Sequence, residues 1–362
     1  MIATEVLKRK RFIETIFSTE NSLLATRTLI AFPSKYRYYA ACSMTKKFVI
    51  GIDGGGTKTT VVLADLQGNV LAEETAGASN FLIIGVEKAA EVLYAAADAC
   101  CRKAGLSFDH VEALAAGLTG AGRASDQQRM HDGLEHYAKA QGSSLNNVII
   151  ESDARVALEA AFKGAAGMIL ICGTGSIALG KSSDGRVFRV GGWGRIIGDE
   201  GSGYTIGREG LNAVTRQLDG RAKKTLITEL VAKNLKLKTQ EDIIAAVYRE
   251  NLDVASVAQL VVEAAEKQDT ECERILNKAT FELTEHVRAL TLAMEHAARD
   301  RARQKIPLAF IGSIIASENV FTNILKHKIM FSLPQVTIVQ PKAPPSYGAV
   351  LLALHSSGST TS

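Results

Sequence analysis

Two segments of the chain repeat the same order of apolar runs and turns, and this repeat limits the fold more than any other feature. The first copy opens with the apolar run Phe48–Asp53, and the second opens with Met168–Cys172. In each copy the run leads into a turn rich in glycine and threonine, then a second strand, a glycine turn and a third strand. Recurrence in the same order indicates a duplicated unit. We therefore predict an α/β protein built from two similar halves.

The segments after each copy complete the predicted order of elements. In the first half we expect helices and strands in alternation, namely a helix from Val86 to a stop at Gly105, then Val111–Gly117, Ser125–Gln141, Val148–Glu151 and Ala154–Phe162. In the second half residues 204–303 have almost no strand signal and read as amphipathic helices separated near Gly220, Lys238, Asp253 and Asp269. The chain then continues with a strand Leu308–Ile311, a helix from Ser317, a strand Val336–Gln340 and a helix Tyr347–His355.

A chain of 362 residues exceeds what one hydrophobic core usually supports, so we expect two lobes. The predicted N-terminal lobe comprises residues 44–163 together with 345–362. The predicted C-terminal lobe comprises residues 164–344, including a helical insertion at 204–304. Residues 1–43 precede the first clear strand and are predicted to be an extension outside both lobes.

The formal net charge of +4 lies entirely in that N-terminal extension. Residues 1–43 hold seven Lys or Arg against three Glu, so the remainder of the chain is neutral. A neutral body has no basic stripe for a phosphate backbone, which argues against nucleic acid as a partner. The extension itself is compatible with a targeting peptide or with an upstream start codon and a disordered leader, and composition does not separate the two.

The five cysteines, Cys42, Cys100, Cys101, Cys172 and Cys272, show neither paired nor zinc-binding spacing. This usage favours a reducing compartment, and we expect a cytoplasmic protein. No window approaches eighteen uninterrupted apolar residues, so no membrane partner is expected.

The first candidate site is the turn Asp53–Thr59, with the sequence Asp-Gly-Gly-Gly-Thr-Lys-Thr. Consecutive glycines let backbone amides approach an anion, and threonine and lysine side chains supply further donors. Neither a Walker A loop nor a dinucleotide fingerprint fits, because a strand follows where those motifs need a helix. A plain glycine-rich hairpin turn remains the alternative. Asp53 suits a magnesium ion bound through water, or simply the start of the turn.

The second candidate, Gly173-Thr174-Gly175-Ser176, duplicates the first about 117 residues later. Alone it would read as an ordinary hairpin turn. Two such turns facing one site would clamp a triphosphate, and phosphoryl transfer needs mainly positioning and charge stabilisation.

Two further segments carry candidate side chains. Asp153 follows a strand and opens a helix, so it suits either a general base or a helix N-cap, and its position alone does not decide between them. The segment Gly191–Gly203 holds six glycines, an acidic pair and the only tryptophan, Trp193. Such a loop can wrap closely around a ligand, with Asp199 available to accept hydrogen bonds from hydroxyls.

With these elements in this order, the sequence resembles the N-acetylglucosamine kinase group of the BadF/BadG/BcrA/BcrD-type ATPases, within the actin-like, sugar kinase and heat-shock ATPase superfamily. The resemblance covers about Lys47 to Leu354. It rests on Asp-Gly-Gly-Gly-Thr-Lys-Thr at 53–59, Ser-Asn at 79–80, Asp153, Cys-Gly-Thr-Gly-Ser at 172–176, Gly-Gly-Trp-Gly at 191–194, Gly-Asp-Glu-Gly-Ser at 198–202 and Gly-Ser at 312–313.

The resemblance implies an actin-like, ribonuclease H-like fold with a nucleotide and sugar cleft between two lobes. It also implies roles for single residues. The predicted ATP and phosphate contacts are Gly55, Gly56, Thr57, Lys58, Thr59, Gly173, Thr174, Gly175, Ser176, Gly312 and Ser313. The predicted sugar contacts are Asn80, Asp153, Gly192, Trp193, Gly194 and Asp199. Asp153 would be the base that activates the sugar 6-hydroxyl, which favours catalysis over capping.

The implied activity is ATP-dependent phosphorylation of a small sugar at its 6-hydroxyl, most simply N-acetylglucosamine or glucosamine, with Mg²⁺ and ATP as cofactors. A homodimer is left open. The alternative is an activator ATPase of a partner enzyme, like those of the 2-hydroxyacyl-CoA dehydratases, but the sequence lacks suitably placed cysteines for a shared iron–sulfur cluster. Arg155 departs from the small residues common in the group, and we expect it to affect the acceptor site.

Overall fold

The structure is a computed structural model that describes residues 47–297 and 305–358. The predicted extension, residues 1–43, lies outside the described residues. Among the residues that the structure describes, no helix has the length and apolar character needed to cross a membrane.

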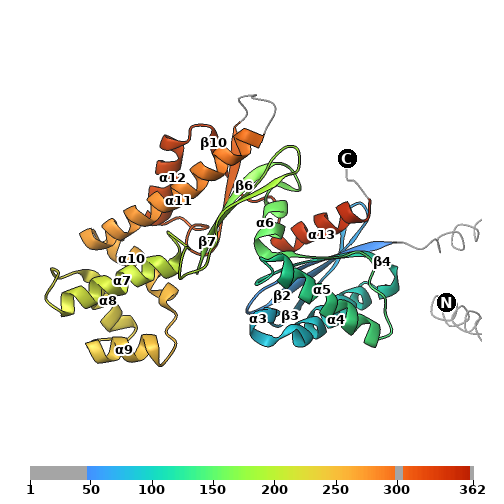
Figure 1. Cartoon of the computed structure of the whole chain (residues 1–362), viewed down its shortest axis with the longest axis horizontal. Helices are drawn as coiled ribbons and strands as arrows, with labels where there is room; N and C mark the ends of the chain where they lie inside the picture. Colours follow the sequence, from blue (N-terminus) through green and yellow to red (C-terminus); the bar gives the residue numbers. More distant parts are fainter. Residues whose placement is uncertain (1–46, 298–304, 359–362) are drawn as a thin grey trace, which may run out of the picture. The chain divides into compact units, whose positions relative to one another are not determined.

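The first half of the described chain builds a mixed five-stranded sheet (Figure 1). Its strands are β1 (Phe48–Gly54), β2 (Thr59–Asp65), β3 (Val70–Ala76), β4 (Val111–Leu118) and β5 (Val148–Ser152). Their order in the sheet is β3-β2-β1-β4-β5. The three strands of the first repeat are antiparallel, while β4 and β5 run parallel to β1. As a result β1, β4 and β5 all end at the same edge of the sheet.

The second half builds a sheet of the same topology. Its strands are β6 (Gly167–Cys172), β7 (Ser176–Lys181), β8 (Val187–Gly191), β9 (Ile306–Ile311) and β10 (Val336–Val339). Their order, β8-β7-β6-β9-β10, matches that of the first sheet strand for strand, with β6, β7 and β8 antiparallel and β9 and β10 parallel to β6. The predicted duplication is therefore confirmed.

Helices cover both faces of the first sheet (Figure 1). On one face α4 (Val86–Lys103) and α5 (Ala124–Ala140) pack against Ile50 and Ile52 of β1. On the other, α13 (Pro345–Ser356) packs against Val49 of the same strand. Alternate β1 residues therefore face opposite layers, as the period of two along a strand requires. This explains the continuous apolar run that opens the chain's first repeat.

Helix α6 (Asp153–Phe162) contacts elements of both sheets. Its Val156 packs with α13 and the first sheet, while Leu158 and Phe162 pack with Ile169 and Leu179 of the second. Almost every residue of this short helix is buried, so it has no solvated face. The helix that begins with Asp153 is consequently fixed from two sides.

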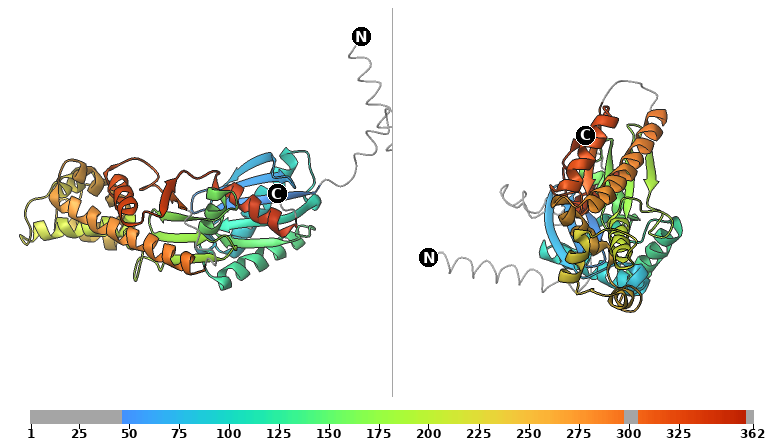
Figure 2. Two further views of the ribbon diagram at one scale, coloured as in Figure 1. Left: turned by 90° about the horizontal axis from the view of Figure 1, so that it is seen from above. Right: turned by 90° about the vertical axis from the view of Figure 1, so that its left-hand side faces the viewer.

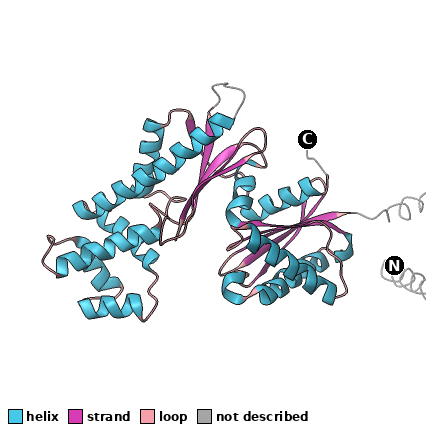
Figure 3. Cartoon of the chain, viewed as in Figure 1, coloured by secondary structure: helices cyan, strands magenta, loops and turns pink. Residues whose placement is uncertain are grey.

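Within the described part of the segment between β8 and β9, residues 203–297 are largely helical, as predicted. It contains α7 (Gly203–Leu218), α8 (Leu226–Asn234), α9 (Gln240–Tyr248), a 3-10 turn (Val254–Ser256), α10 (Val257–Glu266) and α11 (Thr270–Ala297). The breaks fall where glycine, lysine and aspartate interrupt the apolar pattern. These helices and α12 (Val320–Ser332) share one large apolar cluster with the second sheet (Figures 2 and 3).

Two local details differ from the sequence expectation. A short helix, α3 (Phe81–Ile84), follows β3 and was not predicted, because four residues carry too little periodicity to be recognised. Helix α12 begins at Val320 and not at Ser317, because Asn319 is its N-cap and accepts a hydrogen bond from the Thr322 N–H at 2.9 Å.

Candidate active site

Polar side chains gather at the edge of the first sheet where its three parallel strands end. Asp53 is the penultimate residue of β1, Thr119 directly follows β4, and Asp153 directly follows β5. The Thr119 N–H donates to the Gly54 carbonyl at 2.9 Å, and its hydroxyl donates to Asp153 Oδ2 at 2.8 Å. Thr119 therefore ties the end of β1 to the Asp153 carboxylate. Ligand sites in open α/β sheets lie at this edge.

Asp153 is not the side-chain cap of its helix. Ser152 takes that role, because its hydroxyl accepts a hydrogen bond from the Arg155 N–H at 3.2 Å. Asp153 instead receives the Thr119 hydroxyl on Oδ2 and the Ala154 N–H on Oδ1 at 2.7 Å. The carboxylate is half-buried and held in one orientation by donors from two elements. The capping interpretation left open by the sequence is thus wrong, since the preceding serine does the capping.

The electrostatics at this edge favour a bound cation. Burial raises the pKa of Asp53, the negative charge of Asp153 raises it further, and Lys58 opposes both effects. Two carboxylates that repel each other are relieved by a divalent cation. No group of three or more His, Cys, Asp or Glu side chains able to hold a metal occurs among the described residues. Magnesium bound chiefly through phosphate and water needs only one or two carboxylates, so Asp53 fits that use.

The first glycine turn presents backbone donors to solvent. The Gly55 N–H closes the hairpin on the Lys58 carbonyl at 3.0 Å, which leaves Gly56, Thr57 and Lys58 exposed at the tip. Within the described residues, the N–H groups of Gly56 and Thr57 have no acceptor. The exposed tip thus carries the Thr57 hydroxyl, the Lys58 ammonium and the two backbone N–H groups. These are the kinds of donor that an anion site requires.

The second glycine turn repeats this arrangement. The Gly173 N–H bonds to the Gly175 carbonyl at 3.0 Å, and Thr174 is exposed at the tip. Two neighbouring carbonyls also accept bonds from the start of α7, because Gly203 N–H donates to Gly173 and Tyr204 N–H donates to Thr174. The second hairpin is therefore fastened to the N-terminus of a helix.

Thr59 and Ser176 are placed differently from the prediction. Each opens the second strand of its repeat and is buried, and its hydroxyl donates away from the hairpin tip. Thr59 Oγ1 donates to the Gly77 carbonyl at 2.7 Å, and Ser176 Oγ donates to the Glu200 carbonyl at 2.7 Å. These side chains tie each hairpin to the loop that follows the third strand. The two hydroxyls therefore support the turns, and a phosphate contact at Thr59 or Ser176 stays a prediction for the backbone alone.

The loop after β3 places Asn80 beside the end of β4. Ser79 N–H donates to the Gly55 carbonyl at 3.0 Å, which holds the loop against the first hairpin. Asn80 Oδ1 caps α3 by accepting from the Leu82 N–H at 3.2 Å. A Cβ on Gly120 would lie 3.3 Å from that same oxygen, so Asn80 and the residue after Thr119 are neighbours.

The corresponding loop after β8, residues Gly191–Gly203, carries the other predicted sugar contacts. Gly191, Gly192 and Gly194 have φ of 74°, 70° and 86°, which other residues rarely adopt. Trp193 between them is 71% exposed. The sugar contacts predicted from the sequence therefore come from equivalent loops, one in each repeat.

Asp199 lies against the second hairpin, at the far end of this loop. A Cβ on Gly175 would meet the Asp199 carboxylate at 2.9 Å. The Asp199 carbonyl accepts the Thr205 hydroxyl at 2.8 Å, which fixes the backbone at a φ of 57°. The side chain predicted as a sugar contact is thus in direct contact with the phosphate hairpin as well.

His286 of α11 supports the same loop from its buried side. A Cβ on Gly191 would lie 3.0 Å from His286 Nε2, and the Glu200 carboxylate lies 3.6 Å from that nitrogen. Burial lowers the pKa of His286, while Glu200, Glu282 and Asp199 raise it. Its Nδ1 is buried without a hydrogen-bond partner among the described residues.

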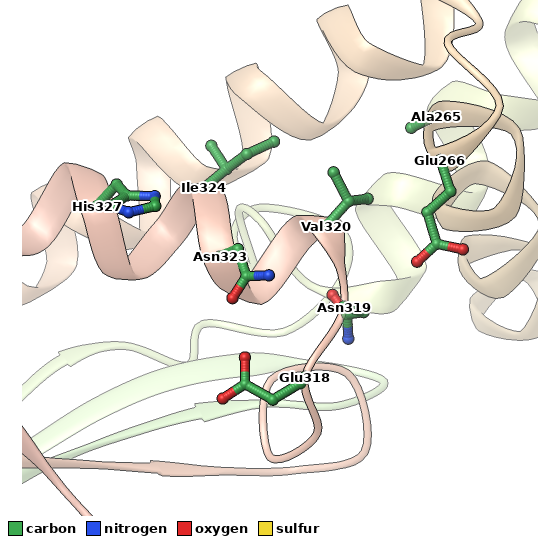
Figure 4. A pocket seen from close by; sticks show the side chains of 8 residues that line it. All are labelled: Ala265, Glu266, Glu318, Asn319, Val320, Asn323, Ile324 and His327. Atoms are coloured by element: carbon green, nitrogen blue, oxygen red, sulfur yellow. The ribbon is translucent and has the colours of Figure 1, made fainter.

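Gly312 and Ser313 follow β9, next to the second hairpin. Gly312 has a φ of 105°, and a Cβ there would lie 2.3 Å from the Cys172 carbonyl oxygen, so only glycine fits. The chain then runs to Asn319, whose Nδ2 donates to the Ile314 carbonyl at 2.8 Å. A cavity of about 500 Å³ opens here (Figure 4). Its lining includes Glu266 of α10, Glu318 and Asn319 from the segment before α12, and Asn323 and His327 of α12 itself.

Arg155 forms an ion pair within its own helix. Its guanidinium pairs with the Glu159 carboxylate one turn further along α6. Glu159 is 3% exposed and also receives Lys181 of β7 at 2.9 Å. Arg155, Glu159 and Lys181 thus form an ion triad around one buried carboxylate, which joins α6 to the second sheet. The effect of Arg155 on the acceptor stays a prediction. Thr119 was not predicted as a site residue. The signal that could have identified it is a polar residue directly after a buried strand.

A duplicated mixed sheet with two glycine hairpins and a held carboxylate at its strand ends defines the class of actin-like ATPases. The chain belongs to the BadF/BadG/BcrA/BcrD ATPase family, whose model matches residues 50–353.

Curated relatives match almost their full length. The chain is 34% identical over 312 residues to an N-acetylmuramic acid/N-acetylglucosamine kinase from Clostridium acetobutylicum, covering 85% of this chain and 98% of the relative. It is 32% identical over 325 residues to an N-acetyl-D-glucosamine kinase from Dictyostelium discoideum, covering 86% and 99%. Among solved structures, one from Chromobacterium violaceum, described as a candidate N-acetylglucosamine kinase, superposes with a TM-score of 0.64 at 26% identity, covering 86% of this chain and 99% of that one.

Proposed function

We propose that this protein is an ATP-dependent sugar kinase that phosphorylates the 6-hydroxyl of N-acetylglucosamine or glucosamine. The observation that carries the proposal is the Asp153 carboxylate, held by Thr119 at the strand edge beside the first glycine hairpin. A carboxylate fixed next to a phosphate cradle is the arrangement that transfer to a hydroxyl needs. The names of the relatives point to the same class of substrate.

ATP binds through the two hairpin tips in this proposal. Gly55, Gly56, Thr57 and Lys58 supply donors from the first turn, and Gly173, Thr174 and Gly175 supply donors from the second. The Thr59 and Ser176 side chains are left out, because their hydroxyls are buried and used elsewhere. Gly312 and Ser313 lie beside the nucleotide, and we assign the nucleoside to the cavity that follows them. Its carboxylate and amide side chains can bond to ribose hydroxyls and to an adenine amino group.

The sugar lies between the loops of the two repeats, against Asn80, Gly192, Trp193, Gly194 and Asp199. Asp153 accepts the proton of the 6-hydroxyl as its oxygen attacks the γ-phosphorus. The bond between that phosphorus and the β,γ-bridging oxygen breaks, and ADP leaves together with the sugar 6-phosphate. The proton remains on Asp153 until solvent removes it. A base in this position contributes on the order of 10²–10⁴ in rate.

Magnesium, where present, would neutralise charge on the transferring phosphoryl group. Asp53 would hold it through water, and the raised pKa of Asp53 in the cation-free site accords with this role. We place the protein in the cytoplasm, because the described cysteines Cys100, Cys101, Cys172 and Cys272 are unpaired thiols.

The activator ATPase alternative is weaker. A cluster shared between subunits needs exposed thiols, and all four cysteines among the described residues are buried. Burial raises the pKa of Cys172 to about 12, which opposes the thiolate that a cluster requires.

The proposal is tested by measuring ADP release with N-acetylglucosamine, glucosamine, N-acetylmuramic acid and glucose, and by identifying the product as a 6-phosphate by NMR. We expect one of the amino sugars to give the highest kcat/KM. The proposal fails if no sugar stimulates ADP release above the rate without sugar.

A further inference from the structure

Arg189 contacts the backbone of the proposed sugar loop at two successive carbonyls. It lies on β8, two residues before the loop, and its Nε donates to the Gly191 carbonyl at 3.1 Å. Its terminal nitrogen donates to the Gly192 carbonyl. Bonds from a guanidinium are charge-assisted and about twice as strong as neutral ones. One exposed side chain thus fixes the entry to the loop.

The same guanidinium also lies against the tryptophan of the loop. The Arg189 Cζ is 5.8 Å from the centroid of the Trp193 ring, within the range of a cation–π contact. A Cβ on Gly192 would lie 3.0 Å from the Arg189 terminal nitrogen, so the contact is as close as a glycine backbone allows. Arg189 therefore sets both the path of the backbone and the direction of the ring.

The loop has few restraints of its own near Trp193, apart from the Gly198 N–H, which donates to the Gly194 carbonyl at 2.9 Å. Gly191, Gly192 and Gly194 can adopt most backbone conformations, and fixing each of them costs entropy. The far end is restrained by the second hairpin, where Ser176 holds the Glu200 carbonyl and Asp199 lies on Gly175. The near end, which carries Trp193, has Arg189 as its polar restraint on the exposed side.

We propose that Arg189 is a positioning residue for the sugar, acting through the Gly191 and Gly192 carbonyls and the Trp193 ring without touching the reacting atoms. The inference rests on the proposed sugar-kinase function. It assigns to Arg189 a part in sugar affinity that is separate from ATP binding, since the guanidinium is bonded to the sugar loop and not to a hairpin tip.

Lysine cannot replace arginine in this role. The ammonium of lysine is a single point of charge, whereas the planar guanidinium presents donors to two acceptors at once. Arg186 offers a matched control on the same hairpin. It is exposed, bonds to Asp184 at 2.7 Å and lies 6.0 Å from the Phe188 ring, so it shares the chemistry of Arg189 but contacts the β7–β8 turn.

The test compares Arg189→Ala, Arg189→Lys and Arg186→Ala in the full chain. We expect both Arg189 variants to raise the KM for N-acetylglucosamine about tenfold or more, as loss of charge-assisted bonds predicts, with the KM for ATP within about twofold of wild type. Because Trp193 is the only tryptophan, its fluorescence reports the loop directly. Acrylamide should quench it more strongly in sugar-free Arg189→Ala than in wild type. Arg186→Ala should match wild type in all three measurements.

Unchanged sugar KM and unchanged quenching in Arg189→Ala would overturn the inference, as would a parallel rise in the KM for ATP. Full recovery in Arg189→Lys would refute the two-carbonyl contact. If Arg189→Ala does not fold, Arg189→Lys decides by the same measurements. Absence of sugar phosphorylation in wild type would sink the proposed function. Titration of Trp193 fluorescence with sugar would still give the dissociation constants of wild type and variants, and equal constants would overturn the role of Arg189.

Discussion

The two sheets share one topology, but their strand ends carry different chemistry. At the penultimate position of the central strand the first sheet has Asp53, and the second has Ile171. The residue after the next parallel strand is Thr119 in the first sheet and Gly312 in the second. The first sheet thus has carboxylates and a hydroxyl at its strand ends, whereas the second has Ile171 and Gly312 at two of these places and the uncharged Gln340 after β10.

This difference shows how a duplicated unit can divide its work. Both copies keep the hairpin tip and the buried hydroxyl that ties it to the following loop, so both offer backbone donors to an anion. The first copy carries Asp53, Thr119 and Asp153 at its strand ends, whereas in the second copy the carboxylate nearest the hairpin, Asp199, comes from the loop after β8. In the second copy the Gly312 backbone lies directly against Cys172, where a Cβ would come within 2.3 Å of the carbonyl oxygen. In the proposed function the base therefore comes from the first copy alone, while the hairpins of both copies bind the nucleotide phosphates.

The largest effect should come from the carboxylate of the first half. We expect Asp153→Asn to lower kcat by about 10²–10⁴, because the amide cannot accept the hydroxyl proton. Glu151→Gln, two residues earlier, is the control and should retain activity, since that carboxylate bonds to Gln127 at 3.3 Å. ADP release at saturating sugar measures both. If kcat of Asp153→Asn stayed within a few fold of wild type, Asp153 would not be the base, and the proposed difference between the halves would be wrong.

The next effect concerns Gly312, the counterpart in the second sheet of Thr119 in the first. Gly312→Ala should destabilise the fold by about 2–4 kcal/mol, because a Cβ would collide with the Cys172 carbonyl oxygen and the φ of 105° is strained for alanine. Gly56→Ala, in the open tip of the first hairpin, should cost less than about 0.5 kcal/mol. Urea unfolding of both variants checks this. Equal stabilities of the two variants would show that alanine is tolerated as well at Gly312 as at Gly56.

A smaller effect is expected from the hydroxyl that orients Asp153. Thr119→Val removes the donor to Oδ2, and we expect kcat to fall roughly 10- to 100-fold, corresponding to the worth of a hydrogen bond to a charged group. Thr337→Val of β10 in the second half is the control, because that hydroxyl is buried without a partner among the described residues. Its kcat should stay at the wild-type value. A wild-type kcat for Thr119→Val would show that Thr119 does not orient Asp153 for catalysis.

The smallest effect is a gain in stability on replacing Asp53. The folded state binds the Asp53 proton more tightly than the unfolded state does, so wild-type stability falls as pH rises through the raised pKa. Asp53→Asn removes that penalty and should be more stable than wild type at neutral pH without nucleotide. The gain should shrink as pH falls toward 3.8, the ordinary pKa of aspartate. Thermal unfolding from pH 4 to 8 measures it, and a loss of stability at neutral pH would contradict the prediction.

Most strands and helices follow from local pattern. The continuous apolar runs of β1 and β6 predict strands covered on both faces, and glycines mark the turns between them. The recurrence of that pattern was enough to predict two similar halves. The family motifs, in turn, direct attention to Asp153 and to the loop with Trp193.

The contacts within the site could not be read in this way. Thr59 and Ser176 look like phosphate contacts in sequence, but which way a strand hydroxyl points depends on what covers that face. Thr119 and Asp153 are 34 residues apart, and only the parallel pairing of β4 with β5 brings them together. Arg155 was expected to affect the acceptor site, but the sequence did not indicate its ion-pair partner. Helix geometry places Glu159 one turn away in that role.

The sequence by itself determined the duplicated α/β framework and the two glycine turns, because these depend on periodicity and on backbone freedom along short stretches of chain. The candidate base, Asp153, was identified through the family resemblance. Tertiary structure alone decided which hydroxyls support the turns, which one orients Asp153, and that Arg189 holds the loop of Trp193. Each of these is a contact made across strands or around a turn, and its energy depends on distance and burial that no local pattern encodes.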